Sequence, residues 1–186
     1  MKTILFDTAL EMFYKYGFDN VSVDEIAQNA GVSKGSFYNH FTSKESVLME
    51  QFKKIDDYYD KTLAALPENV SASEYLTAFI GAMTHFCAKI CGIDFLRVVY
   101  AAQAGKPGKT RLINNKERRI YYHLRRAVAI GRSTGEFRSP LPDEELVELL
   151  ARSARSLIFD WCIYGDELDL EVEGQRYFKI LIACFA

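Results

Sequence analysis

Hydrophobic residues along the chain recur every three or four positions, the spacing that places them on one face of an α-helix. No segment alternates apolar and polar residues as a strand would. The first helix is predicted over residues 2–16, and Gly17 is predicted to end it, as glycine often does just past a helix C-terminus. Its apolar stripe consists of Leu5, Ala9, Phe13 and Tyr16.

Two short helices follow, joined by a glycine turn. Ser22, with Glu25 three residues later, has the pattern of a capping box and predicts a helix over residues 23–30. Gly31 supplies the turn, and Ser33 is predicted to cap a very short helix that ends near His40. A helix pair of this kind is typical of a helix-turn-helix, whose second helix enters the major groove of DNA.

Six longer helices are predicted in the rest of the chain, which brings the total to about nine in an all-α fold. Ser43 opens the first of them, and either Ser71 or Ser73 opens the second. The expected ranges are 43–65, 71–90, 93–104, 110–132, 143–164 and 170 to the C-terminus. Loops are predicted at 105–108 and 135–142, where glycine and proline gather.

The helix pair offers a polar face suited to a DNA duplex. Four apolar residues are predicted to wedge it against the first helix, so that the opposite face points outward: Ile26, Val32, Phe37 and Phe41. That outward set is Lys34, Gly35, Ser36, Tyr38, Asn39 and His40. Basic and amide side chains can read guanine and adenine edges in the major groove. Phosphate contacts are expected at the helix starts, beside Ser22, Ser33 and Lys44. A helix pair that is merely short and polar on one side would have the same pattern.

This segment resembles the N-terminal domain of the tetracycline-repressor (TetR) family. The similar runs are GFDNVSVDEIA at 17–27, AGVSKGSFYNHF at 30–41 and SKE at 43–45, about the first quarter of the chain. The resemblance implies an all-α homodimer with a DNA-binding domain at 1–46 and a ligand-binding and dimerisation domain at 47–186. It also implies that members repress transcription and release DNA when a small molecule binds. By the same resemblance, the residues that face the operator are Lys34, Ser36, Tyr38, Asn39, His40 and Lys44.

Charge is unevenly distributed along the 186 residues, whose net charge is −2. Residues 1–50 hold four basic and seven acidic side chains, so DNA affinity must rest on a few well-placed groups, with modest salt dependence. Residues 97–132 hold ten basic side chains and one acidic one. This basic stretch is either a solvated helix face or, if Arg118, Arg119 or Arg125 turns inward, part of a site for an anionic effector.

The C-terminal helices offer apolar faces for a pocket and for a second copy of the chain. The predicted pocket residues, which form either a cavity for a small-molecule effector or a filled core, are Phe79, Met83, Phe86, Phe95, Tyr100, Tyr121 and Trp161. The predicted dimer seam is a two-fold four-helix bundle from the last two helices. Its residues are Leu146, Leu150, Ser153, Leu157, Trp161, Phe178, Leu181 and Phe185. The alternative is that both stripes are buried within one chain.

Other classes of function receive little support from the sequence. No catalytic residues are assigned, because the chain lacks a GxSxG motif, a phosphate loop, an HExxH motif and paired carboxylates. No cofactor or metal is expected; Cys87, Cys91 and His85 are conceivable ligands, but free cysteines are usually small buried apolar residues. An enzyme using the apolar pocket and a protein-binding helical adaptor are the competing readings. The apolar runs are too short to span a bilayer, so the expected location is the cytoplasm.

Overall fold

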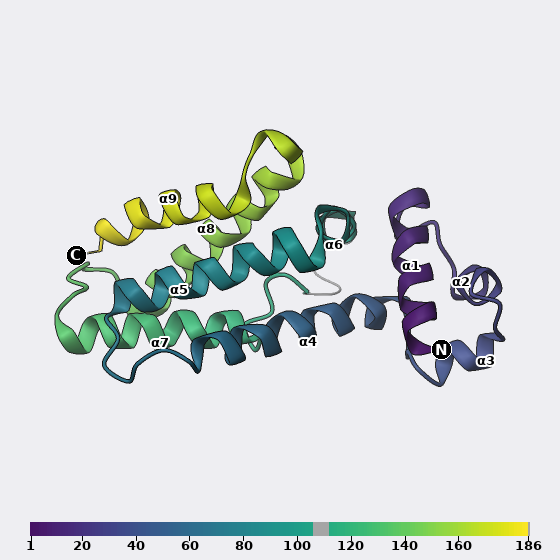
Figure 1. Ribbon diagram of the computed structural model, residues 1–186, viewed down its shortest axis with the longest axis horizontal. Helices are drawn as coiled ribbons and strands as arrows, with labels where there is room; N and C mark the ends of the chain where they lie inside the picture. Colours follow the sequence, from purple (N-terminus) through teal and green to yellow (C-terminus); the bar gives the residue numbers. More distant parts are fainter. Residues whose placement is uncertain (106–111, 186) are drawn as a thin grey trace. The chain divides into compact units, whose positions relative to one another are not determined.

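The computed structural model describes residues 1–105 and 112–185, and every regular element in this part of the chain is a helix (Figure 1). The α-helices are α1 Lys2–Tyr16, α2 Val23–Asn29, α3 Lys34–Tyr38, α4 Lys44–Leu63, α5 Ala72–His85, α6 Ile93–Gly105, α7 Arg119–Thr134, α8 Asp143–Tyr164 and α9 Leu170–Ala183. A π-helical turn η1 (Phe86–Cys91) follows α5, and a 3-10 turn η2 (Gly165–Glu167) follows α8. The described helices confirm the all-α prediction.

The chain divides into two compact units. The first consists of Met1–Lys54 with Asp94–Asn114, and the second of Ile55–Ile93 with Asn115–Ala186. The predicted domain boundary after residue 46 therefore falls inside α4, which contributes residues to both units. The helix α6 belongs to the first unit, although it lies far along the sequence from α1–α3.

The core of the first unit fixes how α3 is oriented. Phe37 is fully buried, and its ring centroid lies 5.6 Å from that of the buried Phe41. On α1, three of the four predicted stripe residues are buried, whereas Tyr16 is exposed at the end of the helix. Three of the four predicted wedge residues, Ile26, Phe37 and Phe41, are thus buried, whereas Val32 is half-buried. The buried Phe37 anchors α3 by the side opposite its polar face.

Serine caps begin α2, α3 and α4, as the sequence predicts. The Ser22 hydroxyl accepts a hydrogen bond from the Glu25 amide, and the Glu25 carboxylate accepts one from the Ser22 amide, which completes the capping box. Ser33 Oγ accepts from the Ser36 amide at 3.1 Å, and Ser43 Oγ accepts from the Ser46 amide at 3.3 Å. These caps satisfy amides that a short helix would otherwise leave without partners.

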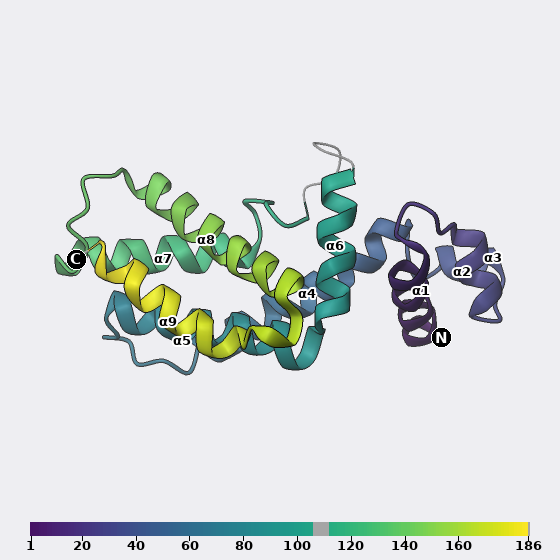
Figure 2. The same ribbon diagram turned by 90° about the horizontal axis from the view of Figure 1, so that it is seen from above.

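The second unit is built around α5. This helix runs beside α9 on one side and α7 on another, and α7 also packs on α8 (Figures 1 and 2). The approach of α5 to α9 depends on Gly174, where an added Cβ would lie 2.6 Å from Thr84 Cγ2. Because real Cβ contacts are never that short, a side chain at this position would push the two helices apart.

A carboxylate from the loop after α7 closes the start of α5. Glu136 accepts hydrogen bonds from the backbone amides of Ala72 at 2.7 Å and Ser73 at 2.8 Å, and also from the Ser73 hydroxyl. Burial raises the pKa of Glu136, but these hydrogen bonds outweigh it and hold that pKa below its ordinary value. The first turn of α5 is therefore capped both by Ser71 and by a residue from another segment.

Two helix bounds differ from the prediction. Ser71, not Ser73, caps α5, and the α-helix ends at His85, after which the backbone continues as η1 to Cys91. The basic helix was predicted from residue 110, but α7 begins at Arg119. Residues 112–118 form turns and bends, and 106–111 lie outside the described residues. Helical periodicity in the basic stretch therefore overestimated the length of α7.

The structure also differs from the predicted dimer seam, because that stripe is covered by its own chain. The buried members of the stripe are Leu146, Leu150, Ser153, Leu157, Trp161, Phe178 and Phe185, and Leu181 is half-buried. The alternative of burial within one chain accounts for them. Other apolar side chains on the same two helices are exposed, and we refer to them as the exposed apolar row: Leu149, Phe159 and Ile163 on α8, and Val172 and Ile180 on α9.

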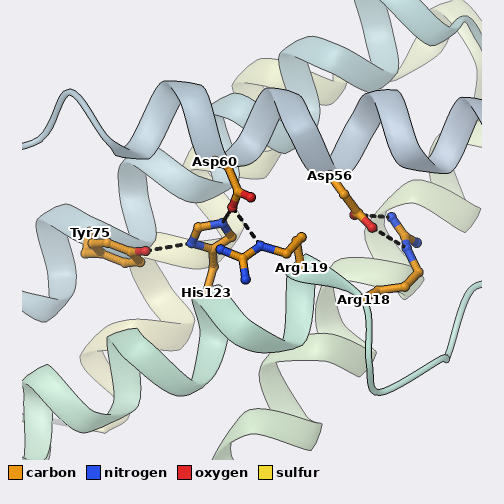
Figure 3. Close-up of polar contacts among 6 residues, drawn as sticks. All are labelled: Asp56, Asp60, Tyr75, Arg118, Arg119 and His123. Carbon is orange, nitrogen blue, oxygen red and sulfur yellow. Dashed lines mark hydrogen bonds and ion pairs between the residues drawn. The ribbon is translucent and has the colours of Figure 1, made fainter.

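A polar network lies inside the second unit and joins three of its helices (Figure 3). On α7, the buried His123 places Nε2 2.8 Å from Asp60 Oδ1 on α4 and Nδ1 2.7 Å from the Tyr75 hydroxyl on α5. A carboxylate only accepts, so Nε2 carries the hydrogen and the Tyr75 hydroxyl donates to Nδ1. Arg119 Nε also donates to Asp60, at 2.8 Å. The neutral imidazole therefore has both nitrogens paired.

Folding stability should fall in mildly acidic solution because of His123. Burial lowers the pKa of His123 below its ordinary value of 6.5, although the hydrogen bond to Asp60 opposes the shift. Below pH 6.5 the unfolded chain binds a proton that the folded chain resists, so the free energy of unfolding decreases as pH falls from 7 toward the lowered pKa. The slope for one proton is at most about 1.4 kcal/mol per pH unit.

Urea unfolding at pH 7 and pH 5.5 measures this effect. The His123→Gln variant should be less stable at pH 7 but should lose less stability between the two pH values than the parent protein. The His40→Gln variant changes an exposed histidine and should keep the parental pH dependence. Equal pH dependence in all three proteins would contradict the assignment to His123.

Candidate functional site

The polar face predicted for the short third helix lies on the surface of the first unit. Tyr38 is 49% exposed, and Gly35, Asn39 and His40 are also exposed. Ser36 is half-buried, so its side chain is less accessible to solvent than predicted. The fully buried Phe37 ring occupies the opposite side of α3 and meets the Tyr38 ring edge-on at 5.6 Å. The polar side of α3 is therefore presented to solvent by a side chain anchored in the core.

Lys34, at the start of α3, already has an anionic partner. Its Nζ lies 2.8 Å from a carboxylate oxygen of Asp24 on α2, and both side chains are exposed. The hydrogen bond to Asp24 raises the pKa of Lys34 above its ordinary value, so the ammonium stays charged. Because an exposed ion pair is weak in water, a phosphate can replace the carboxylate at little cost.

Two of the predicted phosphate contacts have structural roles in the first unit. The Ser22 hydroxyl donates to Glu25 Oε2 at 2.7 Å within the capping box, and Ser33 Oγ is occupied by the Ser36 amide. Both serines remain exposed, but their hydroxyls primarily hold the starts of α2 and α3. Their structural role is to fix the backbone at these helix starts.

Lys44 differs most from its predicted role. Its Nζ donates to the backbone carbonyl oxygens of Phe18 at 2.6 Å, Val21 at 3.0 Å and Asp19 at 3.4 Å. The residue is half-buried, and its ammonium lies 4.5 Å from the centroid of the Phe18 ring. The side chain points back onto the loop between α1 and α2, not outward toward a duplex.

A surface hollow of about 410 Å³ lies between this loop and the start of α4. Tyr38 of α3 forms part of its wall, together with the segments at residues 19–23 and 42–45. Lys44 and Glu45, the first residues of α4, line the hollow, and the N-terminal end of a helix favours anions. The hollow therefore combines the exposed aromatic side chain of α3 with a helix end suited to a phosphate.

The predicted pocket residues are divided between the two units. Phe95 is buried and Tyr100 half-buried in the first unit, whereas the other five are buried in the second. Within the second unit, the Phe79 ring lies 5.1 Å from the Tyr59 ring and 5.6 Å from the imidazole of His123. Of the predicted set, the structure thus brings Phe79, Met83, Phe86, Tyr121 and Trp161 into one core.

Two further hollows lie on the surface of the second unit, away from that core. One, of about 520 Å³, is lined by residues of α8 and the loop before it, including Leu141, Glu144 and Glu148. The other, of about 420 Å³, is lined by Tyr164, Val172 and the acidic turn between α8 and α9. None of the predicted pocket residues lines either hollow.

The basic stretch is largely neutralised by acids of the same chain. Arg118, whose side chain is only 9% exposed, turns inward as the anion-site reading requires, but it meets Asp56 of α4 at 2.8 Å (Figure 3). Five other described bases form ion pairs, namely Arg97–Asp94, Lys116–Glu148, Arg119–Asp60, Arg125–Glu144 and Arg132–Asp143. Arg126 lies over the Tyr75 ring, at 5.2 Å from its centroid. Lys106, Lys109 and Arg111 lie outside the described residues.

Several contacts in these two regions could not be found from the sequence. Asp24, Asp56 and Asp60 are not among the residues predicted from the sequence. In the structure they pair with Lys34, Arg118 and Arg119, respectively. The one available signal was the spacing of Asp56 and Asp60 by one helical turn, which places two carboxylates on one face of α4. That signal does not identify the partner helix.

The described part of the chain has neither a cluster of metal ligands nor a single helix that could span a membrane. There, no group of three or more His, Cys, Asp or Glu residues is placed to hold a metal ion. Cys87 is buried, and burial raises the pKa of its thiol. No single described helix is both long and apolar enough to cross a membrane; Ala72–Cys91 and Ile93–Gly105 pass that test only when counted together.

The N-terminal residues of the chain are similar to a family of regulatory proteins. Residues 5–50 match the family model described as bacterial regulatory proteins, tetR family. Over 63 residues the chain is 40% identical to the uncharacterized HTH-type transcriptional regulator YuxN of Bacillus subtilis. That match covers 34% of this chain and only 21% of YuxN, so it concerns the N-terminal part alone.

Two relatives extend the similarity along the chain. The HTH-type transcriptional repressor KstR2 of Mycolicibacterium smegmatis is 28% identical over 191 residues, covering 96% of this chain and 87% of KstR2. Among solved structures, the transcriptional regulator FadR from Bacillus subtilis in complex with stearoyl-CoA superposes with a TM-score of 0.78 at 20% identity. That superposition covers 98% of each chain and shows that the whole fold is shared.

Proposed function

We propose that the chain, whose residues 5–50 match the model described as bacterial regulatory proteins, tetR family, is a member of that family and a ligand-responsive repressor of transcription. The observation that supports this most strongly is the polar surface of α3, which is exposed opposite the fully buried Phe37. In the proposed complex α3 enters the major groove of double-stranded operator DNA, where Tyr38, Asn39 and His40 meet base edges and phosphates. Residues 1–46 would form the DNA-binding domain and 47–186 the ligand-binding and dimerisation domain.

The repressor acts, in this proposal, as a homodimer that reads two half-sites. A helix-turn-helix dimer places its two recognition helices about one duplex turn, ~34 Å, apart. The exposed apolar row on α8 and α9 supports a seam there, because such a row is poorly solvated when left open. Ile163 is 61% exposed and Ile180 58% exposed, so these residues replace the buried leucines as the proposed contacts.

The proposed effector is a small molecule that carries an acyl chain. Support comes from FadR, which shares the fold over the full chain and whose structure holds stearoyl-CoA. The guanidinium groups of Arg118, Arg119 and Arg125 are already paired with carboxylates of the same chain, so they give no support for an anionic effector. We therefore base the choice of effector on the shared fold and not on the basic stretch.

No catalytic role is proposed. The relatives named above are transcriptional regulators. A repressor that binds genomic DNA would act in the cytoplasm, which is where we propose that this protein acts.

DNA binding should depend on Tyr38. The Tyr38→Ala variant removes an exposed ring and hydroxyl from the groove-facing side of α3, and we expect at least a tenfold weaker Kd, equivalent to ~1.4 kcal/mol. Fluorescence anisotropy with a duplex selected from a random pool by the parent protein measures this. Tyr14→Ala, which removes a 57% exposed tyrosine from α1, is the matched control. Equal affinities of the two variants would rule out the assigned face.

Dimerisation should depend on the exposed row of α8 and α9. The double variant Ile163→Glu, Ile180→Glu places two charges in the proposed seam, and sedimentation velocity should show monomers because a buried unpaired charge is costly. Ile90→Glu, which changes an isoleucine that is 52% exposed on η1, should leave the dimer intact. A double variant that sediments like the parent protein would place the seam elsewhere.

Stearoyl-CoA should release the protein from DNA. When the acyl-CoA binds the free form of the protein more tightly than the DNA-bound form, it lowers the apparent affinity for the selected duplex. Titration into the preformed protein–DNA complex, followed by anisotropy, should show release, whereas coenzyme A without an acyl chain should not. Complexes that survive saturating stearoyl-CoA would count against an acyl-CoA effector.

A further inference from the structure

Lys44 lies at the first position of the 20-residue helix α4, where a cation is least expected. The N-terminal end of a helix carries partial positive charge, so an ammonium there is disfavoured unless other groups compensate for it. The compensation comes from the loop between α1 and α2, whose carbonyl oxygens at Phe18, Asp19 and Val21 all accept from Lys44 Nζ. An ammonium carries three N–H donors, and these three carbonyls are acceptors suited to it.

The same side chain is held in place by an aromatic ring. Lys44 Nζ lies 4.5 Å from the centroid of Phe18, within the range of a cation–π contact. Phe18 is buried, and its ring packs edge-on against Phe13 of α1 at 4.8 Å. Lys44 therefore joins the start of α4 to a loop that is itself anchored in the core of the first unit.

This loop leads directly into the surface that the proposed function assigns to DNA. Val21, the last of the three acceptors, immediately precedes Ser22, the cap of α2. The loop and Lys44 also line the 410 Å³ hollow to which Tyr38 contributes a wall. The position of α2 and the shape of the hollow therefore both depend on where the loop carbonyls are held.

From this geometry we infer that Lys44 is a positioning residue for DNA binding and not a phosphate ligand. It holds the loop at residues 18–21, and through the loop it sets the start of α2 and one wall of the hollow at α3. The inference rests on the proposed DNA-binding function. If Lys44 were instead a phosphate ligand, its ammonium would leave the three carbonyls and pair with a DNA phosphate. That contact would release a counterion and so make binding more dependent on salt.

Salt dependence of DNA binding separates the two arrangements. The logarithm of the binding constant falls linearly with the logarithm of salt concentration, and each phosphate contact that is lost makes this slope shallower by about 0.9. Lys44→Met keeps a long side chain and removes the charge; we expect a roughly tenfold weaker Kd at every salt concentration with an unchanged slope. Lys34→Met, which changes an exposed lysine on α3, is the matched control and should lower the slope. A lowered slope in Lys44→Met would overturn the inference, and so would an unchanged Kd, which would leave Lys44 a role in stability alone.

Two further measurements keep the inference testable if Lys44→Met folds poorly. Lys44→Arg keeps the charge, and arginine binds phosphate well, so a phosphate contact predicts parental or tighter affinity. Positioning predicts weaker affinity with an unchanged slope, because a planar guanidinium does not reproduce the three-carbonyl geometry. Parental affinity in Lys44→Arg would therefore contradict the inference.

Hydrogen exchange without DNA tests the loop separately from the proposed function. Amides at residues 19–22 should exchange faster in Lys44→Arg than in the parent protein, whereas Lys34→Met should leave them unchanged. If the parent protein selects no duplex from a random pool, the proposed function fails, and the exchange data still report on the carbonyl contacts. Unchanged exchange in Lys44→Arg would show that Lys44 does not hold the loop.

Discussion

The burial of one aromatic ring determines the DNA-facing surface of this protein. α3 is only five residues long, far below the length at which an isolated helix is stable in water. Its conformation therefore depends on tertiary contacts, chiefly the fully buried Phe37, and on the Ser33 cap. Because successive residues on so short a helix point in fixed directions, anchoring Phe37 also sets the direction of Tyr38.

Charge acts differently in the two compact units. In the first, few cations are available, and two of the most relevant, Lys34 and Lys44, contact groups of the chain itself. In the second, the basic residues around the start of α7 are matched by Asp56 and Asp60 of α4. An excess of basic residues in one stretch of sequence therefore says little about the electrostatic potential at the protein surface. Acidic side chains from other helices can neutralise those residues in the folded chain.

The sequence was most informative where the determining interactions are local. Ser22, Glu25 and Gly31 act within a few residues of their own position, so the caps and the turn of the helix pair followed from spacing alone. Periodicity also identified the apolar faces of α8 and α9. It could not say whether the same chain or a second copy covers those faces, and the buried Leu150 and Phe178 show that it is the same chain.

Interactions between distant segments were not predictable in this way. The pairing of His123 with Asp60, 63 residues apart, requires knowing which turn of α7 faces α4. The contacts of Lys44 depend on carbonyl directions in a loop, which no side-chain pattern encodes. Residues that act through backbone atoms of other segments are thus the part of a site that sequence reasoning finds last.

The carboxylate of Glu136 at the start of α5 has a consequence for how this protein can vary. Surface connections between helices usually tolerate added or deleted residues, because their backbone is solvated and their length costs little. The connection after α7 does not have this freedom, since Glu136 must reach the amides of Ala72 and Ser73 just after Gly135 ends the helix. An insertion there would change two helices at once, so a peptide tag is better placed in the loop around Pro67 than in the loop after α7.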